Sequence, residues 1–213
     1  MPRVLSEEAV GEFRERLIDA AERLFAAHGL EAVTMRQLAA ELGVSPMTPY
    51  RYFADKDAIL AAVRARAFRR HAEALEAARA GKTHGAEGSS SISRAYVRFA
   101  LDHPEAYKLM FDVEQPNSAD YPELVAAGER SRATMTAYLR DLAEAGVLAP
   151  DADIELIGHM FWSALHGPIQ LQLAGYLKAP YDAERLSEAL SDALWRGVLA
   201  RLGDGAGESG SDH

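Results

Sequence analysis

The chain has 213 residues, 48% of them hydrophobic, and no cysteine. This allows one large or two small domains, and it excludes disulfides, thiolate metal sites and cysteine nucleophiles. The net charge of −9 argues against a nucleic-acid partner only for the chain as a whole, because residues 1–82 carry 13 basic against 12 acidic side chains and residues 83–213 carry 10 against 20.

No apolar run approaches the ~18 residues of a membrane span, and residues 1–13 lack the apolar segment of a signal peptide. We therefore expect a cytoplasmic protein without a membrane partner. Apolar residues recur with the helical period almost throughout, and no strand pattern or internal repeat occurs. These patterns predict an all-α fold of about nine helices. The first helix spans residues 10–28 and ends at Gly29, a favourable residue just past a helix end.

A second helix begins with a complete start signal. Thr34 is placed to cap it, and Gln37, three residues later, can return a hydrogen bond to the Thr34 backbone. The helix runs to about Leu42, where Gly43 supplies the positive φ of a tight turn. Two short helices around a glycine turn are the outline of a helix-turn-helix, which places its second helix in the major groove of DNA. The predicted motif spans residues 34–53.

The start of the reading helix has two interpretations. Ser45 can cap it, with Pro46 at its favoured first position. Pro49 argues for a later start, since it cannot donate to the Ser45 carbonyl and it pushes Thr48 away from helical φ and ψ. In the second interpretation the helix begins at Pro49.

Several side chains around the motif are free to contact DNA. They are Thr34, Arg36, Ser45, Met47, Thr48, Tyr50, Arg51 and Lys56. Thr48 and Arg51 are candidates for base edges, because arginine can bind guanine through two hydrogen bonds, and Arg36 can reach a base or a phosphate. We expect Tyr52 and Phe53 to pack in the core.

Lys56 lies in the first turn of the next predicted helix, residues 56–80, which Asp55 can cap. The helix dipole disfavours a cation there. A bound phosphate would reverse that penalty, and so would Asp55 or Asp57. This long helix links the motif to the rest of the chain.

The segment 81–91 is rich in Gly and Ser and predicts a flexible loop. A phosphate-binding loop is disfavoured, because Glu76 occupies the place of the earlier glycine and a helix, not a strand, precedes it. Further helices are predicted over 91–102, 104–111, 123–145, from Asp151 or Asp153 to 177, and over 183–202. Gly167-Pro168 should kink or break the helix that contains it. The acidic, Gly/Ser-rich tail 203–213 should be disordered.

Around the motif the sequence resembles the TetR family of transcriptional regulators. The matching positions are Thr34, Leu38, Ala39, Gly43, Val44, Ser45, Tyr50, Tyr52, Phe53, Lys56 and Leu60. The resemblance covers about the first 65 residues. It implies a three-helix DNA-binding domain over residues 1–56 and a helical ligand-binding and dimerisation domain over residues 57–202.

The resemblance also implies that Tyr50 and Lys56 bind phosphates and that Thr34 and Ser45 hold phosphates at helix starts. The chain departs from the family pattern just before the tyrosine. Met47-Thr48-Pro49 stands where the family usually has Gly-Thr and an apolar residue. This departure leaves the identity of the base contacts open.

A small-molecule pocket is implied in the second part, and pockets are lined by apolar and aromatic groups with a few polar ones. Its candidate residues, which can equally be ordinary core, are Phe99, His103, Tyr107, Met110, Phe111, Met135, Tyr138, Phe161, Trp162 and His166. His159 and His166 share a helix face, but a metal site needs a third ligand such as His103. We predict no metal and no other cofactor.

The last two predicted helices, 154–177 and 183–202, have wide apolar faces. These faces can form a four-helix interface with a second copy, or they can serve as core within one chain. A homodimer matches the palindromic operators that such motifs read.

The leading hypothesis is therefore a sequence-specific DNA-binding regulator, a repressor released from its operator by an unknown small molecule. The chain has none of the metalloprotease, serine-hydrolase or dinucleotide motifs, so we predict that it is not an enzyme. The alternatives are an enzyme without these motifs, a metal or haem sensor built on the histidines, and an activator in place of a repressor.

Overall fold

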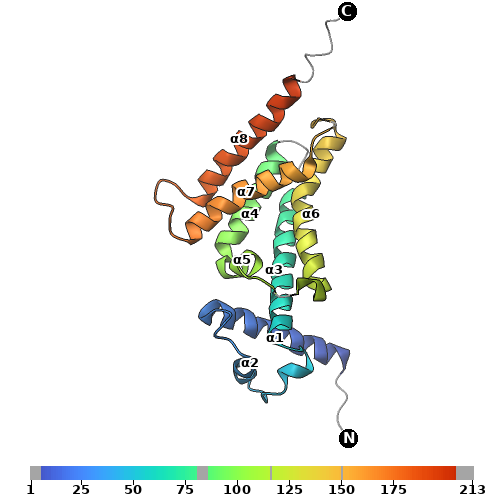
Figure 1. Ribbon diagram of the computed structural model, residues 1–213, viewed down its shortest axis with the longest axis vertical. Coiled ribbons are helices and arrows are strands. Elements are labelled where there is room, and N and C mark those ends of the chain that lie inside the picture. Colours follow the sequence, from blue (N-terminus) through green and yellow to red (C-terminus); the bar gives the residue numbers. More distant parts are fainter. Residues whose placement is uncertain (1–5, 81–85, 116, 150, 205–213) are drawn as a thin grey trace, which may run out of the picture. The chain divides into compact units, whose positions relative to one another are not determined.

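The structure is a computed structural model, and it describes residues 6–80, 86–115, 117–149 and 151–204. Among these residues every regular element is helical, which confirms the all-α prediction (Figure 1). The elements are α1 (Glu7–His28), α2 (Met35–Glu41), the 3₁₀-helix η1 (Pro49–Arg51), α3 (Lys56–Arg79), α4 (Ala86–Asp102), α5 (Pro104–Phe111), the 3₁₀-helix η2 (Ser118–Asp120), α6 (Pro122–Glu144), α7 (Ile154–Leu173) and α8 (Ala183–Asp204).

The chain forms two compact units. The first contains Met1–Arg69 and Glu105–Glu129, and the second contains Arg70–Pro104 and Arg130–His213. Because these ranges interleave, α3 and α6 each contribute residues to both units. The segment 105–129, which follows α4 in the chain, is therefore part of the same compact unit as the predicted helix-turn-helix.

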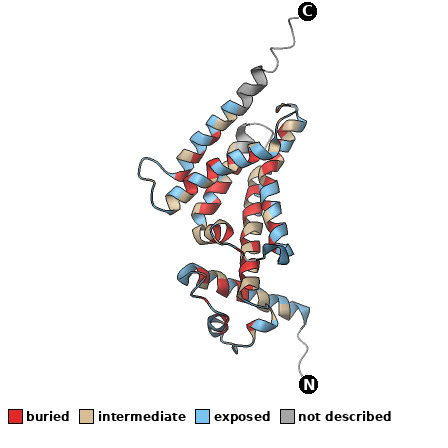
Figure 2. Ribbon diagram, viewed as in Figure 1, coloured by how far each residue is buried: buried red, intermediate tan, exposed pale blue. Residues whose placement is uncertain are grey.

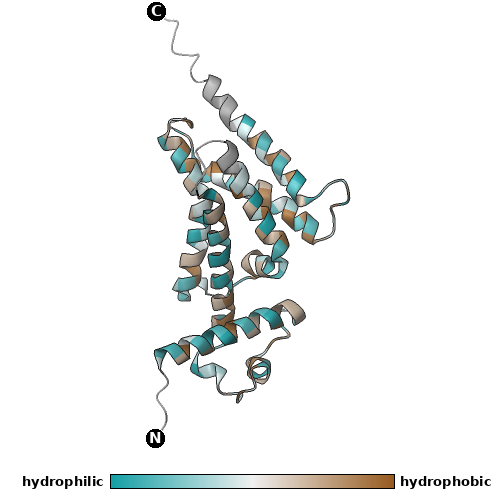
Figure 3. Ribbon diagram, turned by 180° about the vertical axis from the view of Figure 1, so that it is seen from behind, coloured by the Kyte–Doolittle hydropathy of each residue, from teal (hydrophilic) through white to brown (hydrophobic). Residues whose placement is uncertain are grey.

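The first unit has one main hydrophobic core, visible as buried positions along α1 and the first half of α3 (Figure 2). Its buried members include Leu17, Ile18, Phe25, Leu38, Phe53, Ile59, Leu60, Val63 and Leu109. Figure 3 shows that hydrophilic residues are frequent along α1. Arg66 of α3 forms ion pairs with Asp19 and Glu22 of α1, and the two helices are thus joined by polar as well as apolar contacts.

The segment 105–129 is held to α3 by specific polar contacts. The Arg64 guanidinium donates to the Met110 carbonyl at 3.0 Å, and the Gln115 side-chain amide donates to the Asp57 carbonyl at 3.1 Å. The two hydrogen bonds join the segment to α3 at two separate points, Arg64 and Asp57.

In the second unit α4, α7 and α8 pack pairwise against one another. Of the predicted kink or break in α7, the break is wrong, because the helix is continuous from Ile154 to Leu173 with Pro168 inside it. Proline there removes one backbone hydrogen bond. Pro168 and its neighbour Ile169 are both buried, and the apolar surface they bury offsets that loss.

The predicted loop 81–91 is wrong over its second half, because α4 begins at Ala86. Ser91 is buried and its hydroxyl donates to the Ala78 carbonyl at 3.0 Å, which ties the start of α4 to α3. Packing has here overridden a Gly- and Ser-rich composition. The predicted disordered tail lies almost wholly outside the described residues.

Candidate nucleic-acid interface

The helix that opens the motif begins as predicted. Thr34 is extended and accepts from the Gln37 backbone N–H at 3.3 Å, while the Gln37 side chain accepts from the Thr34 N–H at 2.9 Å. This reciprocal pair satisfies two backbone donors that the first turn of a helix leaves unpaired. It fixes where α2 starts and leaves the Thr34 side chain at the surface.

The turn that follows α2 has the predicted geometry. Gly43 has φ +65°, a region that costs little only for glycine. The Gly43 N–H donates to the Ala40 carbonyl at 3.1 Å, and the Val44 N–H donates to the Ala39 carbonyl at 3.0 Å. Ala39 is completely buried, so only a small side chain fits where the chain reverses.

The reading element starts late. The predicted cap at Ser45 with Pro46 at the first position is wrong, because the regular element is η1, which begins at Pro49. The Ser45 hydroxyl lies 3.1 Å from the Thr48 hydroxyl, and the Thr48 N–H donates to the Ser45 carbonyl at 2.9 Å. Proline removes the donor that an earlier helix start would have needed, and the structure agrees with the alternative start at Pro49.

The residues after η1 anchor it to the first unit. Phe53 is buried, and Tyr52 stacks on Phe13 with ring centroids 4.4 Å apart, which confirms that both belong to the core. Arg14 of α1 donates to the Tyr52 carbonyl at 2.6 Å and lies over the Phe53 ring at 4.2 Å. Sequence reasoning missed Arg14, because no local pattern distinguishes it from the other charged residues of α1.

The predicted DNA contacts have the exposure that such contacts need. Thr34, Arg36, Ser45 and Arg51 are exposed, and Thr48 and Lys56 are half-buried. Met47 and Tyr50 are large side chains that are nevertheless 67% and 48% exposed. Pro49, between them, is buried. The polypeptide from 45 to 51 therefore turns Pro49 inward and most of its polar, aromatic and cationic groups outward.

Lys56 has a partner that neither sequence interpretation named. Its ammonium donates to the Leu30 carbonyl at 3.1 Å. Asp55 instead caps α3 by accepting from the Ala58 N–H at 2.8 Å. An ammonium has three donors, so Lys56 can hold Leu30 and still donate to a phosphate.

The predicted pocket residues fall into separate groups. Tyr107, Met110 and Phe111 lie in the first unit, and Phe99, His103, Met135, Tyr138, Phe161, Trp162 and His166 lie in the second. In the second unit the Trp162 indole donates to the Tyr96 hydroxyl at 2.9 Å, and Phe161 packs against Trp195 with ring centroids 4.8 Å apart. These contacts place several of the candidates in aromatic packing.

A polar group that the sequence did not reveal lies in the same interior. His71 of α3 is fully buried, with Nδ1 2.8 Å from the Ser131 hydroxyl and its ring edge-on to Tyr96 and Phe99. Its Nε2 has no partner among the described residues. Burial lowers the pKa of His71 from 6.5 to about 4, so the ring is neutral at physiological pH.

Two kinds of site are absent from the described part of the chain. No group of three or more His, Asp or Glu side chains there is arranged to hold a metal ion. No helix there is both long enough and apolar enough to cross a membrane.

Two family models match the chain. Residues 17–63 match "Bacterial regulatory proteins, tetR family", and residues 90–194 match "Tetracyclin repressor-like, C-terminal domain". The first match contains the helix-turn-helix, and the second contains α7 and most of α4 and α8.

Individual relatives agree with these models. A helix-turn-helix transcriptional regulator of Mycobacterium tuberculosis H37Rv is 26% identical over 192 residues, which cover 90% of this chain and 80% of that protein. A second regulator from the same species, strain CDC 1551, is 33% identical over 139 residues, and the chain spans 58% of its length. A solved structure of a Rhodococcus sp. RHA1 protein of unknown function is 29% identical, covers 93% of this chain and 99% of its own, and superposes with a TM-score of 0.78.

Proposed function

We propose that this chain, which belongs to the TetR family of transcriptional regulators, is a repressor that a small molecule releases from a palindromic operator. Regulators of this family are DNA-binding proteins, not enzymes. The observation that carries the proposal is the outward row of polar and cationic side chains at 45–51, held on a scaffold of buried and hydrogen-bonded groups.

The proposed contacts divide by chemistry. Tyr50 and Lys56 would hold phosphates, together with the hydroxyls of Thr34 and Ser45, and these contacts set the register of the protein on the duplex. Arg51 and Thr48 would read base edges, because exposed Arg51 and half-buried Thr48 lie on either side of the inward-facing Pro49. Arg36, exposed in the first turn of α2, would reach a base or a phosphate.

A second copy is proposed to pair through α7 and α8. Along α7 the exposed residues Leu156, Met160, Ser163, Gly167 and Leu171 recur at helical spacing. Along α8 the exposed residues Leu190, Ala193 and Gly197 also recur at helical spacing. Leu156 is 57% exposed and Leu190 is 42% exposed, and small residues between the large ones allow two helices to approach closely.

Release by a ligand requires a path to the DNA-binding motif, and the covalent chain offers one. The segment 105–129 joins α4 to the rest of α6, and Arg64 and Gln115 fix it to α3. A displacement of α4 that follows ligand binding would move this segment and, through it, the first half of α3. The population of states that fit the operator would then fall.

DNA recognition is tested by selecting bound sequences from a random duplex pool with the full chain, and then by measuring repression of a reporter placed behind the selected site. We expect two inverted half-sites and repression by the native chain, and loss of both in Tyr50→Ala. Tyr176→Ala is the matched control, because Tyr176 is 77% exposed and belongs to the second unit. Failure to enrich any sequence, or equal repression by Tyr50→Ala, would refute the proposal.

The dimer is tested by sedimentation of the full chain. Leu190→Glu places a charge in the proposed interface, and it should convert the native dimer to a monomer. Tyr181→Glu, at an exposed position before α8, should leave the dimer intact. A native monomer, or a dimer that tolerates Leu190→Glu, would exclude this interface.

A further inference from the structure

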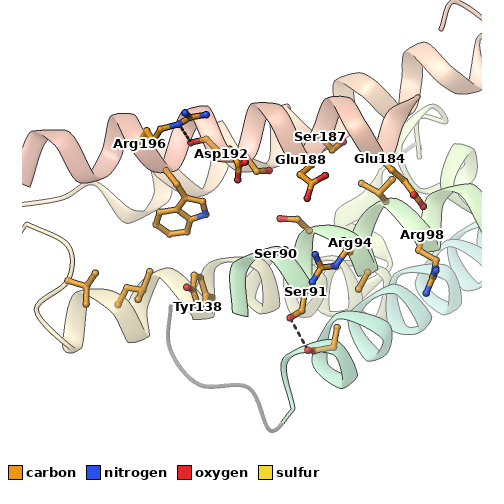
Figure 4. Close-up of a pocket in the computed structure, with 18 residues that line it drawn as sticks. Ser90, Ser91, Arg94, Arg98, Tyr138, Glu184, Ser187, Glu188, Asp192 and Arg196 are labelled. Carbon is orange, nitrogen blue, oxygen red and sulfur yellow. Dashed lines mark hydrogen bonds between the residues drawn. The ribbon is translucent and has the colours of Figure 1, made fainter. Parts of the chain in front are cut away.

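The second unit contains a cleft between α4 and α8, closed at one end by the last turns of α6 (Figure 4). Its volume is about 810 Å³. In the close-up, α8 carries Ser187, Glu188 and Asp192 along one wall, and α4 carries Ser90, Ser91 and Arg94 along the other. Of the residues predicted for a pocket, the cleft includes Tyr138 alone.

The wall formed by α8 has polar groups that lack partners in the part of the chain that the structure describes. Ser187 and Ser191 are 2% and 7% exposed, and neither hydroxyl has a hydrogen-bond partner among the described residues. A buried hydroxyl in a helix commonly bonds to a carbonyl one turn back, and these two do not. An unpaired buried polar group costs roughly 1–3 kcal/mol, so the two hydroxyls are placed at a cost to the free protein.

The end of the cleft next to α6 is apolar. Tyr138 and Trp195 meet there edge to face, with ring centroids 6.0 Å apart, and Leu142 and Val147 lie beside them. Trp195 is half-buried, and a flat apolar group can therefore still pack against it. One end of the cleft thus suits hydrogen-bonding groups, and the other suits an aromatic or aliphatic body.

The charges of the lining indicate which net charge a ligand should have. Arg94, Arg98 and Arg196 are balanced by Glu184, Glu188 and Asp192. All six side chains are exposed. The cleft therefore has no buried charged side chain that could pair strongly with a charged ligand. Hydroxyls can both donate and accept, which suits a carbonyl, hydroxyl or amide group.

We propose that this cleft binds a neutral amphipathic small molecule, with its apolar body against Trp195 and a carbonyl, hydroxyl or amide group on Ser187 and Ser191. This rests on the proposed ligand response and gives it a site and a ligand class. The two hydroxyls supply the hydrogen bonds, and the aromatic end supplies apolar contact.

The position of the cleft on α8 gives binding a route to the oligomer. Glu184, Ser187, Ser191 and Trp195 share one side of the helix. At 100° per residue, Ala193 and Gly197 fall on the side of α8 away from the cleft, and Leu190 falls between the two sides, so the face proposed for the second copy adjoins the cleft wall. A ligand that moves α8 relative to α4 would therefore also move the proposed dimer face.

The test uses Prodan, a neutral naphthalene dye with a ketone whose emission moves to longer wavelength when the ketone accepts a hydrogen bond. Titrated into the full chain without DNA, it should bind saturably. The Ser187→Ala/Ser191→Ala variant should bind it about tenfold more weakly, as the loss of two ordinary hydrogen bonds predicts. Bound dye should also emit at shorter wavelength in that variant. Ser118→Ala, an exposed serine of the first unit, should match the native chain.

Stability separates a binding role from a structural one. Because the two hydroxyls are unpaired, the double alanine variant should unfold at a higher temperature than the native chain when no dye is present. Trp195→Ala should also weaken dye binding, and anilinonaphthalene sulfonate, an anion of similar size, should bind less well than Prodan.

The proposal is overturned by absence of saturable binding, by unchanged affinity and emission in the double variant, or by a lower unfolding temperature for it. Each readout is independent of DNA. A chain that binds Prodan as expected but selects no operator would refute the proposed repressor and leave the cleft assignment standing. A chain that selects an operator but does not bind Prodan would refute the cleft assignment and leave the proposed repressor standing.

Discussion

The helix-turn-helix and the interior of the second unit differ in where they keep their polar chemistry. In the motif the buried positions are apolar or hydrogen-bonded, as with Phe53 and the Tyr52 carbonyl. The side chains proposed to contact DNA lie at the surface. In the second unit His71, Ser187 and Ser191 are buried and each has an atom without a partner among the described residues.

This difference indicates two ways of making a binding surface. The motif presents its side chains on a scaffold that is stable without DNA, so its recognition residues can be changed with little effect on folding. In the interior of the second unit, unpaired polar atoms lower the free energy of unfolding of the free protein. A ligand that forms hydrogen bonds with these atoms would recover that free energy on binding. We therefore expect stability and binding to be separable in the helix-turn-helix and opposed in the second unit.

The largest effect is expected from the scaffold of the motif. Phe53→Ala removes a buried ring from the core of the first unit and should lower the free energy of unfolding by about 3–5 kcal/mol. Tyr50→Ala, three residues earlier at an exposed position, should change it by less than about 0.5 kcal/mol. Urea unfolding of both variants checks this. Similar losses in the two variants would show that recognition and scaffold are not separate.

The next effect concerns pH and the second unit. Because the pKa of His71 falls from 6.5 in the unfolded chain to about 4 in the folded one, the unfolded state binds a proton first as the pH drops. The folded state should therefore lose about 3 kcal/mol between pH 6.5 and pH 4 through this group alone.

The measurement compares the native chain with His71→Leu, each unfolded in urea at pH 7 and pH 4. Carboxylates contribute equally to both proteins and cancel in the difference. The native chain should lose more stability than the variant over this range. An equal loss would show that His71 is protonated in the folded state or that its burial is not maintained.

The smallest effect is at the start of α2. Thr34→Ala removes the hydroxyl that accepts from the Gln37 N–H and should cost about 1 kcal/mol. Thr34→Ser keeps the cap and should restore most of that stability. Thermal unfolding checks both variants. If serine fails to rescue, the hydroxyl is not what stabilises the start of α2.

Local signals in the sequence were sufficient for much of the first unit. The capping box at Thr34 and Gln37 and the positive φ at Gly43 depend only on neighbouring residues, and both are as predicted. The same holds for the cap at Asp55, and Asp153 is one of the two starts predicted for α7. The late start of η1 was among the alternatives, because proline constrains its own neighbours.

Features that depend on tertiary packing could not be predicted from local patterns. Burial of Ser91 places the start of α4 inside a Gly- and Ser-rich stretch, and packing around Pro168 keeps α7 continuous. Arg14 reaches Tyr52 across 38 positions of sequence. Among the described residues, His71, Ser187 and Ser191 each have a side-chain atom without a hydrogen-bond partner, and this depends on which groups the neighbouring helices place beside them.

The central claim is that the exposed residues 34–56 hold a two-fold symmetric operator. A nuclease footprint on the selected DNA tests it most directly, with the native chain and Tyr50→Ala compared at equal concentrations. We expect two protected half-sites roughly one helical turn apart for the native chain and no protection for the variant. A native chain that protects nothing, or a Tyr50→Ala variant that protects the same bases equally well, would contradict it.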